Sequence, residues 1–529
     1  MNIKSAKQEI VNTIKAYRQK DELGNYLIPV QKQRPILLIG PPGIGKTAIM
    51  EQVAQELSIN LVSYTITHHT RQSAIGLPFI SKKEYGGKEM SVTEYTMSEI
   101  IASVYDKIAA TGVKEGILFL DEINCVSETL VPTMLQFLQY KTFGAHKVPD
   151  GFIIVTAGNP PQYNKAVRDF DIVTLDRVKK IEVEEDLEAF REYADVTGVH
   201  GAVLAYLDIH KDNFYKIKND VNGKKFVTAR GWEDLSQFIR TYEKLGIEVD
   251  ENVCGQYLQD PEIARDFAMY YALYRKYEDL YNVEGILQGE VPAERDKLRK
   301  APFDEKLSII SLLIDRLSQE FADYDSKLSV QKELQKEISA IVKGYAKEAN
   351  SEGESDGILS EIRSRSAYLA SEFERKAGAN LMDPATENTM KRTISALGDL
   401  EEKLVIELAQ NAEEEAKEPG ETSLDGGDNT ESRTEKEKAF IKKWFTEREL
   451  ERRSSAEKTG KHLSNCFGFI EKIYGEEQEM VLFLTRLDSG HYSLNFIQNE
   501  GSEEYYKYNR LLLLRERKEE LKEKVLELL

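Results

Sequence analysis

The feature that most constrains the fold of this sequence is a phosphate-binding pattern, G-x-x-x-x-G-K-[ST], near the N-terminus. It consists of the consecutive residues Gly40, Pro41, Pro42, Gly43, Ile44, Gly45, Lys46 and Thr47. The apolar run 36–39 precedes the pattern and a helix-forming stretch, 48–57, follows it. Glycines let a backbone wrap a polyphosphate and aim its N–H groups inward. In this strand–loop–helix setting the pattern predicts a nucleoside triphosphate site rather than a plain Gly/Pro turn.

The polar residues of the loop have distinct expected roles. Lys46 can reach the β- and γ-phosphates, and the Thr47 hydroxyl can bind Mg²⁺. Ala48 opens the following helix, whose N-terminus adds the positive end of its dipole. We therefore expect the whole segment Gly40 to Ala48 to contact the nucleotide.

Length and charge limit the classes of protein to consider. At 529 residues the chain is too long for one core, and two to four domains are expected. The formal net charge is -20, and the sequence contains no block of Lys and Arg that would form a separate basic patch. Such a chain repels a phosphate backbone, so nucleic acid is not expected as the main partner.

Cysteine usage and hydropathy suggest where the protein works. Cys125, Cys254 and Cys466 lie far apart, which favours neither a zinc site nor a disulfide framework. The N-terminus lacks an apolar signal region, and no segment reaches the roughly 18 apolar residues of a membrane span. We expect a cytoplasmic protein without a membrane span.

The apolar runs of the first third predict a parallel sheet. Beyond 36–39 they lie at 61–66, 116–120 and 151–157, with a weaker run at 180–183. Continuous apolar runs that alternate with helices are typical of a doubly wound α/β domain covered on both faces. We expect this nucleotide-binding domain to span residues 1–183.

After residue 184 the strand signals stop and helical patterns dominate. We expect a small helical lid domain at 184–290, whose aromatic stripe in 267–277 is core, and a helical, coiled-coil-like region at 291–410. Residues 411–437 are rich in Glu, Gly, Ser, Thr and Asp and predict a disordered acidic linker. Apolar periodicity resumes in a helical C-terminal module at 438–529.

An acidic pair closes the run 116–120. At the carboxyl end of a strand beside the phosphate loop, Asp121 can hold hydrated Mg²⁺ and Glu122 can polarise the attacking water. An acidic pair in isolation more often caps a helix. Its position one helix–strand–helix excursion beyond the loop favours the functional interpretation.

Three further polar residues are candidates for the same site. Asn159 ends the run 151–157 and could orient the water or contact the γ-phosphate, although Asn before Pro is usually a turn residue. Arg177 lies just before the last run and could bring charge to a phosphate, or form a surface ion pair. Arg230 stands at a helix start in the helical region, where a solvent-exposed position is an equal alternative.

Together these stretches resemble the AAA+ ATPases and, within them, the MoxR family, over about residues 1–290. Gly40–Thr47 resembles Walker A, and Ile117–Asn124 resembles Walker B. Thr156–Pro160 resembles the sensor 1 strand, with Asn159 as its polar residue. Thr174–Val178 resembles the segment that carries the arginine finger, which would be Arg177. The segment 228–236 resembles the sensor 2 helix, so that Arg230 would reach the γ-phosphate.

The resemblance extends to two insertions and has two departures. Gly76-Leu77-Pro78 is similar to part of the family's helix-2 insert, and a hairpin is expected at Gln139 to Val148. Val178 replaces the usual Phe and Ala229 stands where Pro is common. Neither change removes a charge, but Arg168 is a nearby competitor for the finger.

The resemblance implies Mg²⁺-dependent ATP hydrolysis by a ring, with six subunits expected, that remodels a partner protein in a chaperone-like way. It also implies a von Willebrand factor A-domain protein as the leading partner. Two alternatives remain: a DNA-directed AAA+ motor or loader, which the acidity disfavours, and a nucleotide-gated scaffold with little turnover.

Overall fold

The computed structural model describes residues 1–68, 74, 76–163, 170–220, 223–292, 295–348, 357–415 and 428–511. The chain forms two compact units. The first contains Met1–Ala189 and two later segments, Thr228–Gly231 and Glu374–Pro384. The second contains Phe190–Val227, Trp232–Phe373 and Ala385–Leu529.

A five-stranded sheet with parallel pairing forms the centre of the first unit. Its strand order is β2-β5-β8-β1-β9, from β1 (Ile36–Ile39), β2 (Asn60–Thr65), β5 (Gly116–Asp121), β8 (Phe152–Gly158) and β9 (Lys179–Glu182). Every residue of β8 is buried, as expected for a parallel strand covered on both faces. The predicted α/β class and its five strands are confirmed.

Helices connect the strands of this sheet and pack against it. They are α1 (Ile3–Arg18), α2 (Ala48–Glu56), α4 (Glu99–Thr111), α5 (Val131–Tyr140) and the short α6 (Ile172–Leu175). Apolar side chains of α4 and α5, such as Ile101 and Phe137, share one core with Leu118 and Leu120 of β5. Because side chains alternate along a strand, Ile117 of β5 faces the other side of the sheet.

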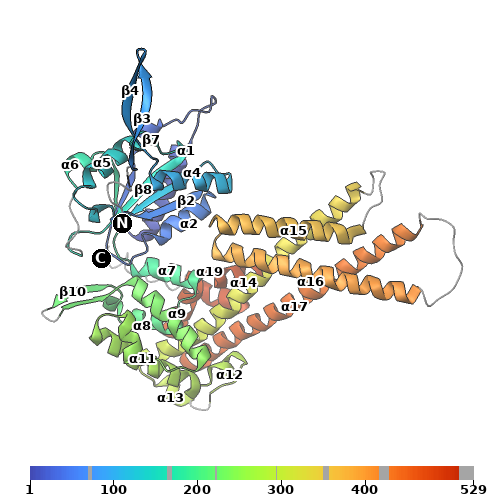
Figure 1. Cartoon of the computed structure of the whole chain (residues 1–529). Helices are drawn as coiled ribbons and strands as arrows, with labels where there is room; N and C mark the ends of the chain where they lie inside the picture. The colour runs from blue at the N-terminus through green and yellow to red at the C-terminus, as the bar shows by residue number, and fades with distance from the viewer. Residues whose placement is uncertain are drawn as a thin grey trace, which may run out of the picture. The chain divides into compact units, whose positions relative to one another are not determined.

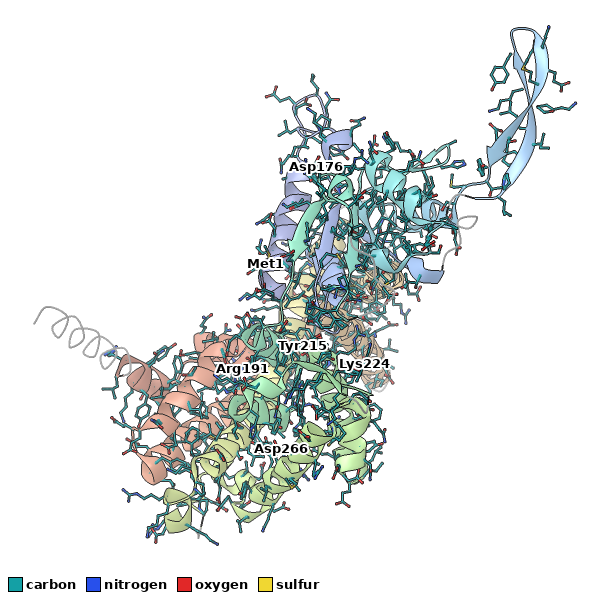
Figure 2. All side chains as sticks on the ribbon, turned by 90° about the vertical axis from the view of Figure 1, so that its left-hand side faces the viewer. Met1, Asp176, Arg191, Tyr215, Lys224 and Asp266 are labelled. Atoms are coloured by element: carbon teal, nitrogen blue, oxygen red, sulfur yellow. The ribbon has the colours of Figure 1, made fainter. Side chains whose placement is uncertain are left out.

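Two antiparallel hairpins extend the first unit. The expected hairpin before β8 is present as β6 (Thr142–Phe143) and β7 (His146–Lys147). The insert after β2 forms a longer ribbon of β3 (Pro78–Tyr85) and β4 (Lys88–Tyr95). This ribbon extends away from the sheet (Figure 1), and side chains stand on both of its faces (Figure 2).

The second unit is almost entirely helical. The helices that lie wholly or mostly in it are α7 (Leu187–Thr197), α8 (Gly201–Ile209), α9 (Ala229–Leu245), α10 (Glu251–Tyr257), α11 (Pro261–Leu280), α12 (Val283–Leu287), α13 (Arg295–Arg299), α14 (Phe303–Glu348), α15 (Gly357–Gly378), α16 (Pro384–Glu415), α17 (Asp428–Tyr474), α18 (Gln478–Ser489) and α19 (His491–Glu500). Phe267, Tyr271 and Tyr274 of α11 are buried, so the aromatic stripe does belong to the core.

One prediction about this region is wrong. Strands do not end with β9, because β10 (Lys216–Asp220) and β11 (Gly223–Val227) form an antiparallel ribbon. Its strands are rich in lysine and lack the apolar alternation by which a strand is usually recognised in a sequence.

The helices after residue 291 do not divide as the sequence suggested. One apolar cluster contains side chains from α14, α15, α16 and α17, among them Leu334, Ile362, Leu400 and Trp444. The region 291–410 and the start of the module 438–529 therefore share a core. The expected linker 411–437 is helical at both ends, since α16 continues to Glu415 and α17 begins at Asp428; residues 416–427 lie outside the described part of the chain.

No helix among the described residues combines the length and the low polarity that crossing a membrane requires.

Candidate nucleotide site

The phosphate loop joins β1 to α2 and depends on two glycines in the left-handed region. Gly43 has φ +73° and Gly45 has φ +92°, values that residues with a Cβ rarely adopt. A Cβ on Gly40 would lie 2.6 Å from the Val183 carbonyl oxygen, so the loop also packs too closely for a larger residue there. These positions explain the glycines of the pattern in physical terms.

Lys46 is the charged centre of the loop and is only 8% exposed. Its Nζ donates to the carbonyl oxygens of Gly40 (2.8 Å) and Pro41 (2.6 Å) and to Asn159 Oδ1 (2.9 Å). Burial lowers the pKa of Lys46 to about 8; Asp121 opposes this shift and the positive charge of Arg230 adds to it. A polyphosphate would supply the negative charge that this buried ammonium lacks.

Asp121 and Thr47 meet where β5 ends beside the loop. The Thr47 hydroxyl donates to Asp121 Oδ2 at 2.9 Å. A hydroxyl and a carboxylate are oxygen donors of the kind Mg²⁺ prefers, and Mg²⁺ usually keeps several waters and binds one or two carboxylates plus substrate phosphates. The two residues predicted to hold the metal therefore lie together and fit it.

Glu122 has an unusual backbone conformation, with φ 56° and ψ 36°. Its N–H donates to Asp121 Oδ1 at 2.9 Å, and its Oε2 accepts from the Thr67 hydroxyl at 3.3 Å. Thr67 was missed in the sequence; the parallel pairing of Thr65 with Asp121 could have indicated that the residues just beyond both strand ends meet.

Asn159 immediately follows β8, and a second asparagine fixes its main chain. Asn124 is buried, and its Nδ2 donates to the Asn159 carbonyl oxygen at 2.7 Å. A Cβ on Gly158 would lie 2.5 Å from Asn124 Oδ1, which explains a glycine at the end of a buried strand. Asn124 is a positioning residue that the sequence did not single out, although it lies in the Walker B-like stretch.

Arg230 belongs to the segment Thr228–Gly231 of the first unit. Its N–H donates to the Gly43 carbonyl oxygen at 3.2 Å. A Cβ on Gly43 would lie 2.9 Å from the Thr228 side chain, so this segment touches the phosphate loop directly. The structure thus brings Arg230 to the loop.

Arg177 lies elsewhere, in the exposed turn after α6. Its N–H donates to the Thr174 carbonyl oxygen at 3.0 Å, and its charge contributes to a lowered pKa of Asp171, mainly set by the hydrogen bonds from Thr174. Neither contact is to the phosphate loop. The neighbouring Val178 is buried in the core of the sheet domain, and Arg168 lies outside the described residues.

The geometry defines a phosphate-loop nucleotide site on a parallel α/β sheet. Comparisons with known proteins agree: residues 36–176 match the family described as ATPase family associated with various cellular activities (AAA). The chain therefore carries an AAA ATPase domain over this range.

The curated relatives are replication factor C large subunits. Those of Pyrobaculum neutrophilum and Pyrobaculum aerophilum are both 25% identical, over 209 and 208 residues, which is 39% and 38% of this chain. The chain spans less than half of their lengths, 43% and 42%. A crystal structure of a candidate ATPase from Cytophaga hutchinsonii is 15% identical, with a TM-score of 0.22, over 37% of this chain and 55% of that one.

Proposed function

We propose that this protein hydrolyses ATP with Mg²⁺. The observation that carries the proposal is the convergence of five polar side chains from two strand ends and the phosphate loop: Lys46, Thr47, Asp121, Glu122 and Asn159. A nucleotide-gated scaffold would need only the binding groups. The presence of Glu122 beside Thr47 and Asp121, the residues that would hold Mg²⁺, supports turnover.

Each residue has a definable task in hydrolysis. Lys46 and the loop N–H groups would bind the phosphates, and Thr47 with Asp121 would hold Mg²⁺, which supplies positive charge for the transferring phosphoryl group. Glu122, oriented by the Thr67 hydroxyl, would accept the proton of the attacking water. Asn159, held by Asn124, would direct its amide toward the γ-phosphate and the water.

Two substitutions separate binding from chemistry. Lys46→Ala should abolish tight ATP binding because it removes the charge that meets the β- and γ-phosphates. Glu122→Gln should keep binding and stop turnover, because it removes the base and keeps the shape. Equilibrium ATP binding and steady-state phosphate release measure the two effects. Wild-type turnover in Glu122→Gln would show that another group is the base.

A ring, with six subunits as in MoxR-like proteins, is the proposed active form. Arg177 is exposed, and the contacts that the structure describes for it are with Thr174 and Asp171 and not with its own phosphate loop, which supports a role in a neighbour's site. ATP added to Glu122→Gln should then convert small species to a ring. Light scattering that reports a monomer at every nucleotide and protein concentration would contradict this proposal.

Remodelling of a partner protein is the proposed use of the ATP. The β3–β4 ribbon supports it, because Phe79, Tyr85 and Met90 lie on one face of the ribbon and are 45%, 52% and 51% exposed. Grouped exposed apolar side chains typically mark a protein interaction site. A von Willebrand factor A-domain protein is the proposed partner, and its capture should weaken in Met90→Ser with ATP hydrolysis unchanged.

A DNA-directed motor is the second candidate, because the curated relatives are replication factor C large subunits. The net charge of -20 opposes it. Binding of duplex DNA whose affinity falls steeply with salt would favour this candidate.

A further inference from the structure

The β10–β11 ribbon is a separate two-stranded sheet in the helical unit. Its register pairs Lys218 with Lys225 and Asn219 with Lys224. On the outer side of β11 the Phe226 N–H donates to the Gln259 carbonyl oxygen at 3.3 Å. Among the described residues no strand pairs with the outer edge of β10, and Figure 1 shows the ribbon extending from the helices of its unit.

This ribbon is basic in a strongly acidic protein. Residues 211–225 contain five lysines (Lys211, Lys216, Lys218, Lys224 and Lys225) and two aspartates, whereas the chain as a whole carries -20. Figure 2 labels Lys224 on this ribbon. The local charge is therefore opposite in sign to that of the whole chain.

The lysines are placed where they repel one another. Lys218 and Lys225 stand directly opposite across the ribbon, and Lys216, two residues from Lys218, is on the same face. Like charges in directly opposed positions destabilise an antiparallel pair. A bound anion would remove this repulsion.

The structure shows an ion pair at Lys225. Lys225 lies 3.8 Å from Glu262, whose side chain is 78% exposed, and an exposed pair of this kind contributes little. Lys211, Lys216, Lys218 and Lys224 form no ion pair with any side chain that the structure describes.

We propose that the β10–β11 ribbon docks an acidic, extended segment of a partner protein. Lys216 and Lys218 are about 7 Å apart along the strand, the spacing of alternate carboxylates in an extended peptide. The free edge of β10 offers main-chain groups to such a segment. Phe226, 38% exposed, lies on the opposite face of the ribbon, together with Lys224.

Nucleic acid fits this surface less well. A duplex would bring its phosphates against a chain of net charge -20, and Asp212 and Glu262 lie beside the ribbon. A short acidic segment carries far less charge and meets only the lysines. The inference rests on the proposed function only in taking the partner to be a protein.

The test is direct binding of a fluorescently labelled peptide of alternating glutamate and threonine to the full chain, followed by anisotropy. The variant is Lys216→Gln/Lys218→Gln/Lys225→Gln, which removes the three lysines that share one face. A matched control, Lys442→Gln/Lys443→Gln/Lys458→Gln, removes three exposed lysines from α17. From the usual contribution of an exposed ion pair, loss of three contacts should weaken peptide binding by about 3- to 150-fold in the ribbon variant. Peptide affinity should be unchanged in the control variant.

A charge reversal makes the test independent of folding. Lys218→Glu should weaken binding of the glutamate–threonine peptide and strengthen binding of a lysine–threonine peptide of equal length. Misfolding does not produce opposite changes in the two affinities. Equal affinity in the ribbon and control variants would overturn the proposal. So would ribbon-dependent binding of duplex DNA without peptide binding. Self-association of the ribbon variant with unchanged peptide affinity would assign the lysines to protection of the strand edge. None of these results alters ATP turnover, which tests the proposed function separately.

Discussion

Replacing Gly43 by alanine tests the contact between the phosphate loop and the segment that carries Arg230. Gly43 has φ +73°, and a Cβ there would lie 2.9 Å from both Cβ and Oγ1 of Thr228. The substitution therefore has two separable effects: strain in the left-handed backbone and overlap with Thr228. Thr228→Gly removes every atom of the overlap and none of the backbone strain.

The structure sets the magnitude. A left-handed alanine costs about 1–2 kcal/mol, and an overlap of this kind adds about 1–3 kcal/mol. If ATP binds only the native loop, Gly43→Ala should weaken ATP binding about 30- to 4,000-fold. In the Thr228→Gly background only the strain remains, and the loss should shrink to about 5- to 30-fold.

A double-mutant cycle on the dissociation constant for ATP measures this difference. The cycle subtracts the separate cost of Thr228→Gly, which also removes the acceptor of the Gly231 N–H at 3.3 Å. Gly45→Ala is the matched control, because Gly45 has φ +92° and no atom lies within 4 Å of a Cβ there. Thr228→Gly should not rescue it. If Thr228→Gly fails to rescue Gly43→Ala, the segment does not rest on the loop in the binding-competent state.

Three further predictions concern the catalytic groups and the helical unit. Mixing Arg177→Ala with Lys46→Ala subunits should partly restore phosphate release, since arginine fingers that act in trans raise the rate by about 10³–10⁵. Mixing Arg230→Ala with Lys46→Ala subunits should not restore it, and rescue by Arg168→Ala in place of Arg177→Ala would identify Arg168 as the arginine finger. Asn124→Ala should lower kcat about tenfold with little change in KM, because it leaves the Asn159 carbonyl without its hydrogen-bond donor. An unchanged kcat in steady-state kinetics would contradict the positioning role of Asn124. Burial raises the pKa of Asp195 to about 6, so the ionised carboxylate destabilises the folded state above that pH, and this destabilisation disappears as the pH falls toward 4. The extra thermal stability of Asp195→Asn over the wild type should therefore shrink between pH 6 and pH 4, and a difference that stays constant would contradict this prediction.

The sheet and most of the site could be predicted because their signals are local. The runs that became β1, β5 and β8 are continuous and apolar since both faces are buried, and the strand ends then place Asp121 and Asn159 near Lys46. The loop glycines are dictated by backbone conformation at Gly43 and Gly45. These constraints act within a few residues and are visible in the sequence.

The remainder depends on pairings between distant segments. Thr67 and Asn124 enter the site through the register of neighbouring strands and through a buried hydrogen bond to the Asn159 main chain. The shared core of α14 and α17 was not predicted, because periodicity shows which face of a helix is apolar and not which helix covers it. The lysine-rich β10–β11 ribbon lacked an apolar pattern altogether.

The most direct test of the account is phosphate release from ATP by the purified full chain, with Mg²⁺ present and with Mg²⁺ chelated, at saturating nucleotide. The wild type should release phosphate only with Mg²⁺, while Glu122→Gln should bind ATP with similar affinity and release almost none. Wild-type release no faster than that of Lys46→Ala, despite tight ATP binding, would contradict the claim that this site hydrolyses ATP.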